Sequence, residues 1–122
     1  MRYIVLLTGH RPTDAPPELM KAIMELGAEA SASGALLDTA GLAPATDAAR
    51  VELREGHLSV MDGPFTEAKE VISYAIYDVR SKEEAVEWAR RFMAVHQQHV
   101  PEWDAVSDVL RLMGPEDFGP PA

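Results

Sequence analysis

The chain has no cysteine among its 122 residues, and this absence excludes disulfides, thiolate nucleophiles and cysteine-type zinc or iron–sulfur sites. No apolar stretch approaches the length that spans a bilayer. The apolar run at the start of the chain stops at Thr8 and lacks the longer segment and the cleavage site of a signal peptide. These absences predict a soluble, cytoplasmic protein that does not enter a membrane.

Basic residues are also few, since 11 Lys and Arg stand against 20 Asp and Glu for a formal net charge of −9. A surface this acidic repels phosphate backbones and anionic membrane surfaces, so we expect no nucleic-acid partner. The hydrophobic share of 47% and the charged share of 25% are those of an ordinary folded domain. We therefore expect one domain over residues 1–122, with a breaker-rich tail at 113–122.

The hydrophobic patterns alternate between strand and helix signals along the chain. Strands are predicted at 2–8, 35–42, 71–79 and 105–113, a hairpin at 50–54 and 58–61, and helices at 14–34 and 82–96. Two helices in so short a chain must lie on one face of the sheet to leave a single core. The order therefore predicts an α+β, ferredoxin-like fold, with an antiparallel sheet, two helices on one face and an inserted β-hairpin.

The opposite face of this sheet would carry residues such as Tyr3, Tyr74 or Tyr77, depending on the register of the strands. An apolar sheet face needs a cover, and a second copy of the chain is the usual one. We therefore expect a homodimer in which the two sheets pack face to face.

Three local features of the sequence carry predictions. Ser81 and Glu84 match a capping box, in which each side chain bonds a backbone N–H of the other residue. Gly56 would supply the positive φ of the hairpin turn. Gly27 lowers the helix propensity of the first helix by about 1 kcal/mol relative to alanine, which predicts a close packing contact there.

The run from Asp62 to Glu70, DGPFTEAKE, places a turn, a proline, an aromatic residue and four ionisable side chains next to one another. One interpretation is a rigid, salt-bridged connector that precedes the strand at 71–79, with Phe65 anchored in the core or at a dimer interface. The other is a pocket that Asp62 or Glu67 lines as an acid or base. Both interpretations stay open at this point.

The four histidines are weaker candidates for chemistry. His10 follows the first strand, where a ligand crevice can open, but it also fits an exposed loop. His57 is expected at the tip of the hairpin, in solvent. His96 and His99 end a helix and could hold a metal together with Glu102, but helix C-termini attract histidines for dipole reasons alone. We expect neither a bound metal nor a cofactor.

The whole chain resembles the DGPF branch of the YCII-related family, through MRYIVLL, a GLAP-like loop, VELREGHLSVMDGPFTEAKE, IYDV, EEAVEWARRF and a tail with EDF. The resemblance implies a dimeric ferredoxin-like α+β barrel with a cleft between the sheet and its loops. It places the signature on Asp62, Glu67, Lys69 and Glu70. Because some family members accompany extracytoplasmic-function sigma factors, it also implies a functional link to such a factor.

The chain departs from the family pattern in two places. Many members have a glycine pair where this chain has Val71-Ile72-Ser73-Tyr74. Broader relatives carry a proposed active-site histidine early in the first helix, paired with an aspartate. The first helix here has no histidine, since His10 precedes it and Asp38 follows it. We therefore do not carry over the lyase-like or dehydrochlorinase-like activity of those relatives.

Two functional hypotheses result. The first is a homodimer of accessory or regulatory role that binds a small organic molecule in a cleft near the DGPF loop. The ligand would contact Asp62, Pro64, Phe65, Lys69 and Glu70. The alternative is a cofactor-free enzyme of proton transfer or elimination, whose catalytic residues would be Asp62, Glu67 and His10.

Overall fold

The computed structural model describes residues 1–65 and 69–119. The strands are β1 (Arg2–Gly9), β2 (Leu36–Gly41), β3 (Ala49–Arg54), β4 (His57–Asp62), β5 (Glu70–Asp78) and β6 (Ala105–Arg111). The helices are α1 (Pro17–Ala32) and α2 (Lys82–His99), and two short 3-10 turns are η1 (Ala45–Asp47) and η2 (Pro115–Phe118). The predicted succession of strands, helices and hairpin is confirmed.

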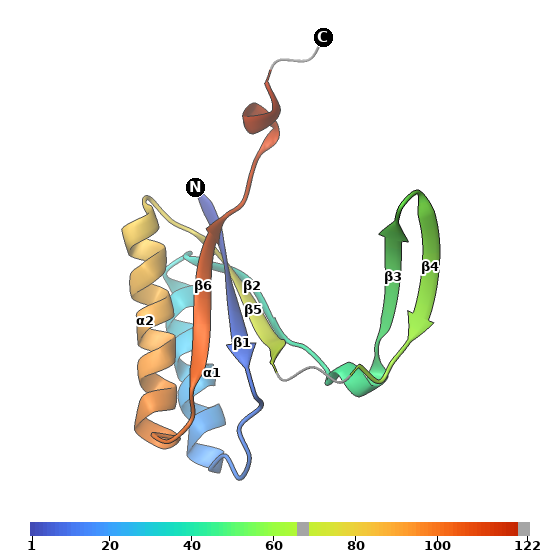
Figure 1. Cartoon of the computed structure of the whole chain (residues 1–122). Helices are drawn as coiled ribbons and strands as arrows, with labels where there is room; N and C mark the ends of the chain where they lie inside the picture. The colour runs from blue at the N-terminus through green and yellow to red at the C-terminus, as the bar shows by residue number, and fades with distance from the viewer. Residues whose placement is uncertain (66–68, 120–122) are drawn as a thin grey trace.

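The main sheet has the strand order β2-β5-β1-β6, and its neighbouring strands are antiparallel. Helices α1 and α2 lie side by side on one face of this sheet, as Figure 1 shows. Each helix connects two strands that are not neighbours in the sheet, which is the split βαβ pattern. The predicted α+β, ferredoxin-like architecture is therefore confirmed.

Local sequence determines where the helices begin and end. Helix α1 begins with Pro17, whose fixed φ and missing N–H suit a first helical position, and it is followed by Gly34 at φ 84°. Before α2, the Ser81 hydroxyl accepts a hydrogen bond from the Glu84 N–H at 3.2 Å, as the capping box predicts. The Glu84 carboxylate instead accepts from the N–H of Arg80 at 3.0 Å, so the reciprocal half of the box is displaced by one residue. In the described chain neither helix is long and apolar enough to cross a membrane.

The core lies between the main sheet and the helices. Tyr3 and Val5 of β1 point toward the helices, as does Tyr77 of β5, whose ring stacks on Trp88 of α2 at a centroid distance of 6.2 Å. Ala85, fully buried, lets α2 approach the sheet closely. The expectation that Tyr3 or Tyr77 lies on the opposite face is wrong, because the two residues are register partners and share the buried side.

The side of the main sheet away from the helices has no helix over it in the described chain (Figure 1). By strand alternation and register, this open face carries Arg2, Ile4, Leu6, Thr8, Asp38, Ala40, Tyr74, Ile76, Asp78, Val106, Asp108 and Leu110. Tyr74 is the one of the three predicted tyrosines that lies here, and its hydroxyl donates to Asp38 Oδ2 at 2.8 Å. The open face thus has an apolar, half-buried centre on β1 and β5, and its charged residues lie on the edge strands and at one end.

Strands β3 and β4 form a separate two-stranded sheet that projects from the body on the open-face side of the main sheet (Figure 1). Its turn has both central residues at positive φ, Glu55 at 52° and Gly56 at 80°. This is the geometry of the tight hairpin turns whose twist matches that of the strands. The predicted hairpin is confirmed, and Glu55 shares the positive φ that was expected of Gly56 alone.

Candidate functional site

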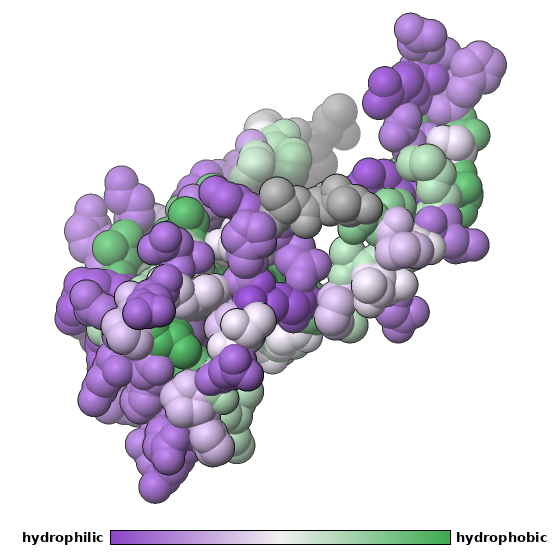
Figure 2. All heavy atoms as spheres, turned by 60° about the horizontal axis from the view of Figure 1, so that its bottom comes forward, coloured by the Kyte–Doolittle hydropathy of each residue, from purple (hydrophilic) through white to green (hydrophobic). Residues whose placement is uncertain are grey.

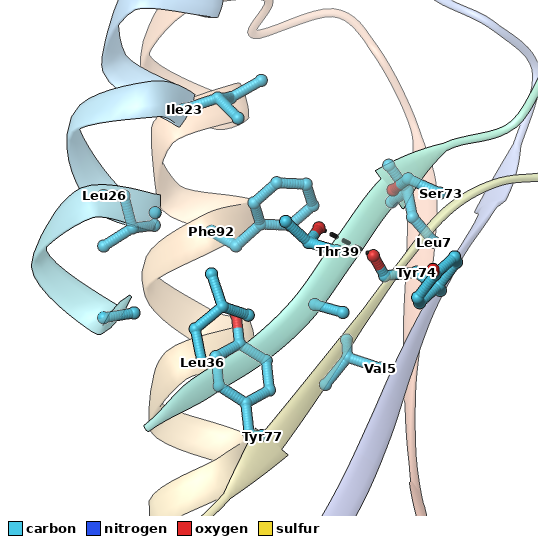
Figure 3. A pocket seen from close by; sticks show the side chains of 13 residues that line it. Val5, Leu7, Ile23, Leu26, Leu36, Thr39, Ser73, Tyr74, Tyr77 and Phe92 are labelled. Carbon is cyan, nitrogen blue, oxygen red and sulfur yellow. Dashed lines mark hydrogen bonds between the residues drawn. The ribbon is translucent and has the colours of Figure 1, made fainter. Parts of the chain in front are cut away.

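A cavity of about 70 Å³ lies between the helices and the main sheet. Its wall is mainly apolar; besides Tyr74 and Tyr77, its large side chains are Val5, Leu7, Ile23, Leu26, Leu36 and Phe92. Figure 3 shows these side chains converging from α1, α2 and the strands on a shared space. A void that holds one water needs about 10–15 Å³ of such volume. The cavity is therefore several times larger than a one-water void.

The cavity exists because small residues occupy positions that face the core. Gly27 and Ala30 of α1 lie opposite Ala75 of β5 in its wall. A Cβ atom added at Gly27 would contact only Leu36 Cδ2, at 4.0 Å. The prediction that Gly27 makes a close packing contact is therefore wrong, because its missing side chain leaves space instead.

Two hydroxyl groups line the cavity without a hydrogen-bond partner. Ser73 and Tyr77 point to the same side of β5, and within the described residues neither hydroxyl makes a hydrogen bond. Figure 3 shows the Tyr77 ring reaching from β5 toward the helices beside Leu36. Burial raises the pKa of Tyr77 above its ordinary value, so the phenol stays protonated and able to donate. The cavity thus combines an apolar wall with two available polar groups.

Glu70, from the DGPF signature, has structural partners. Its Oε1 forms an ion pair with Nε of Arg11, and its Oε2 accepts from the Ala45 N–H at 3.2 Å. Arg11 also donates to the Leu42 carbonyl at 2.7 Å. The carboxylate therefore connects the end of β1 and the start of β5 to the loop that follows β2, as the connector interpretation expects.

The other described signature residues lie at the base of the hairpin. Asp62 ends β4 and is exposed, as are Pro64 and Lys69. Gly63 donates its N–H to the Ala48 carbonyl, and a Cβ there would come 2.7 Å from the Ala45 oxygen, so only glycine fits. Phe65 is half-buried, with the guanidinium carbon of Arg50 4.2 Å from its ring centroid. Phe65 is not part of the buried core. Of its two predicted locations, the core and a dimer interface, the dimer interface stays a prediction. Glu67 lies outside the described residues.

The predicted acid–base pair is not assembled among the described residues. His10 is exposed, and its backbone carbonyl accepts a hydrogen bond from Trp103 Nε1 at 2.6 Å. In residues 1–65 and 69–119 no hydrogen bond links His10 to Asp62. His57 is exposed at the hairpin turn. An enzyme built on His10 and Asp62 thus has no supporting contact here.

The two C-terminal histidines of α2 each direct Nδ1 at their own helix. His96 Nδ1 lies 2.9 Å from the Phe92 carbonyl, and His99 Nδ1 lies 3.3 Å from the Val95 carbonyl. His96 is buried, and its ring contacts those of Phe92 and Trp103 at centroid distances of 4.6 and 5.1 Å. Burial lowers the pKa of His96, which favours the neutral imidazole. Where the structure is described, no three metal-ligating side chains come together.

Residues 1–104, from the first strand through α2, match the model of the YCII-related domain. The chain belongs to the YCII-related family. The search of curated proteins found no match. The resemblance to the YCII-related family is thus confirmed, while membership of its DGPF branch stays a prediction.

Proposed function

We propose that this member of the YCII-related family is a homodimer that binds a small organic molecule, in an accessory or regulatory role. The observation that carries the proposal is the apolar cavity with the hydroxyls of Ser73 and Tyr77, which have no hydrogen-bond partner among the described residues. A chain selected only for a stable core would fill this space, so an occupant is the better explanation.

The lining defines the class of ligand. An alkyl or aromatic group would contact Leu26, Leu36 and Phe92, and an oxygen or nitrogen atom would pair with Ser73 or Tyr77. Apolar pockets with a few convergent polar groups are typical ligand sites. An apolar cavity of about 150 Å³ binds benzene. Since this cavity has about 70 Å³, the ligand inserts a smaller group or widens the cavity. This site differs from the predicted cleft at the DGPF loop, where Glu70 already has its partners.

The homodimer is supported by the open face. Val106 and Leu110 are 52% and 50% exposed there, beside the half-buried Leu6 and Ile76 of the central strands. Apolar faces of this kind on soluble proteins mark interaction surfaces, and a second copy can cover one by two-fold symmetry. A functional link to an extracytoplasmic-function sigma factor remains a prediction from the family resemblance.

Binding can be tested by NMR titration with a library of small alcohols, phenols and amides. A Gly27→Leu variant fills the cavity from α1, and Ala28→Leu adds the same side chain at an exposed position of that helix. We expect Gly27→Leu to weaken binding at least tenfold and Ala28→Leu to leave it unchanged. Tyr77→Phe should weaken the binding of only those probes that form a hydrogen bond with the Tyr77 hydroxyl. If Gly27→Leu binds the same probes as tightly as the wild type, the cavity is not the site.

A further inference from the structure

The projecting hairpin presents one continuous apolar surface, the apolar hairpin face. It consists of Val51, Leu53, Leu58 and Val60, which are 69%, 70%, 74% and 71% exposed. Val51 is the cross-strand partner of Val60, and Leu53 is the partner of Leu58, so the four side chains share one side of the ribbon. Figure 2 shows hydrophobic side chains along one side of the projecting hairpin.

The other side of the hairpin is mainly polar, with the cross-strand pairs Arg50–Met61, Glu52–Ser59 and Arg54–His57. Alternation of this kind is the pattern of a strand with one buried and one solvated side. A two-stranded hairpin alone is at best marginally stable in water. Within the described chain, β3 and β4 pair only with each other and have no extensive contact with another helix or strand. The residue pattern of the apolar hairpin face is therefore that of a buried surface. No other helix or strand of the described chain covers it.

The position of the hairpin indicates what covers it. The hairpin stands apart from the body, on the side of the main sheet opposite the helices (Figure 1). The space beside the open face is where a second copy lies in the homodimer proposed above, and the hairpin borders that space. In a two-fold dimer each chain would supply one hairpin and contact one. The same side of the ribbon ends at the base of the hairpin in the pair Ala49–Asp62, so the charged residue that the pairing places on this side is acidic and disfavours a phosphate-bearing partner.

We propose that the apolar hairpin face packs against a second copy of this chain, so that the hairpin extends the dimer interface beyond the open face. This inference rests on the homodimer of the proposed function and is independent of ligand binding. A Val or Leu side chain presents roughly 100 Å² of apolar surface, so four at about 70% exposure offer roughly 280 Å² per chain. A stable interface buries about 800 Å² per partner. The hairpin would supply about a third of that area and the open face the remainder.

The test compares three variants by sedimentation velocity over a range of concentrations. Leu53→Lys with Leu58→Glu places a complementary charge pair at one cross-strand position, which retains the hairpin pairing but removes two apolar side chains. Ser59→Lys places a charge pair opposite Glu52 on the polar side and is the matched control. Leu110→Glu alters the open face. We expect the first variant to raise the dimer Kd at least 100-fold and the control to leave it unchanged.

The outcomes separate this inference from the proposed homodimer. A monomeric wild type would overturn both. If the Leu53/Leu58 variant dimerises like the wild type while Leu110→Glu is monomeric, the hairpin inference fails and the face-to-face dimer stands. If the Leu53/Leu58 variant is monomeric while Leu110→Glu dimerises, the hairpin contacts the second copy without the open face, and the inference that it extends a face-to-face interface is overturned.

Hydrogen exchange on the wild type gives a second test that needs no mutation. We expect the amides of residues 49–62 to be protected in the dimer and to lose at least tenfold of that protection on dilution below the dimer Kd. Amides of β1 that pair within the main sheet provide the internal control. Equal protection of residues 49–62 above and below the Kd would overturn the inference.

Discussion

Replacement of Gly27 by alanine should stabilise the protein. Gly27 lies in the interior of α1, where glycine is about 0.8–1.0 kcal/mol less favourable than alanine. The new Cβ would meet only Leu36 Cδ2, at 4.0 Å, which is an ordinary van der Waals contact. Because no neighbouring atom must move, we expect the free energy of unfolding to rise by roughly 1 kcal/mol.

For a chain of 122 residues, an unfolding entropy of about 2.1 cal/mol/K per residue converts this gain to a Tm increase of roughly 4 °C. Thermal and urea unfolding followed by circular dichroism at 222 nm would measure it. Gly56→Ala is the matched control, because Gly56 has φ 80° in the hairpin turn. The same methyl group there should lower stability by about 1 kcal/mol, since alanine is strained in that conformation.

The reasoning would be refuted if Gly27→Ala destabilised the protein by 0.5 kcal/mol or more. Such a loss would mean that α1 and β2 approach each other more closely than the 4.0 Å contact allows. The cavity, and with it the proposed ligand site, would then be filled by the protein itself. A gain in stability together with weaker probe binding would instead place Gly27 at the ligand.

Further measurements address other parts of the fold. Phe65→Ala should cost about 1–2 kcal/mol in urea unfolding, because the half-buried ring loses its contact with Arg50 but is not a core residue; a loss above 3 kcal/mol would contradict this. Ser81→Ala should cost about 1 kcal/mol, since it removes the hydrogen bond from the Glu84 N–H; an unchanged urea midpoint would contradict the cap. Burial lowers the pKa of His96 below 6.5, so the unfolded chain takes up the proton first and stability should decline as pH falls below about 6.5. His96→Phe should remove the part of this stability loss that the His96 imidazole causes. If the urea midpoints of the wild type and His96→Phe were identical across pH 7.5–5, the prediction would be wrong.

The succession of elements could be predicted from the sequence because its signals are local. The β-branched run at 71–79 corresponds to β5, and the alternation at 50–54 and 58–61 corresponds to the hairpin strands. The capping residue Ser81 was identified from its spacing to Glu84. Each of these features depends on residues only a few positions apart.

Features that depend on register or on empty space could not be predicted in this way. The pairing of Tyr3 with Tyr77 decides which tyrosines are buried, and it joins strands that are far apart in the chain. The cavity has Gly27 and Ala75 in its wall, and a missing side chain leaves no motif. The sequence signal that could have indicated the cavity is the presence of small residues at core-facing positions of both a helix and a strand.

The Arg11–Glu70 ion pair has a consequence for how chains of this kind can vary. Arg11 donates a hydrogen bond to the Leu42 carbonyl, and Glu70 accepts one from the Ala45 N–H. Because Arg11 and Glu70 are themselves paired, the segment between β2 and β5 leaves the body and returns to it at the same place. Changes of length inside that segment need not move β2 or β5. Insertions and deletions should therefore be tolerated within the hairpin, between residues 50 and 61, and the hairpin could lengthen or shorten in evolution while the body keeps its shape.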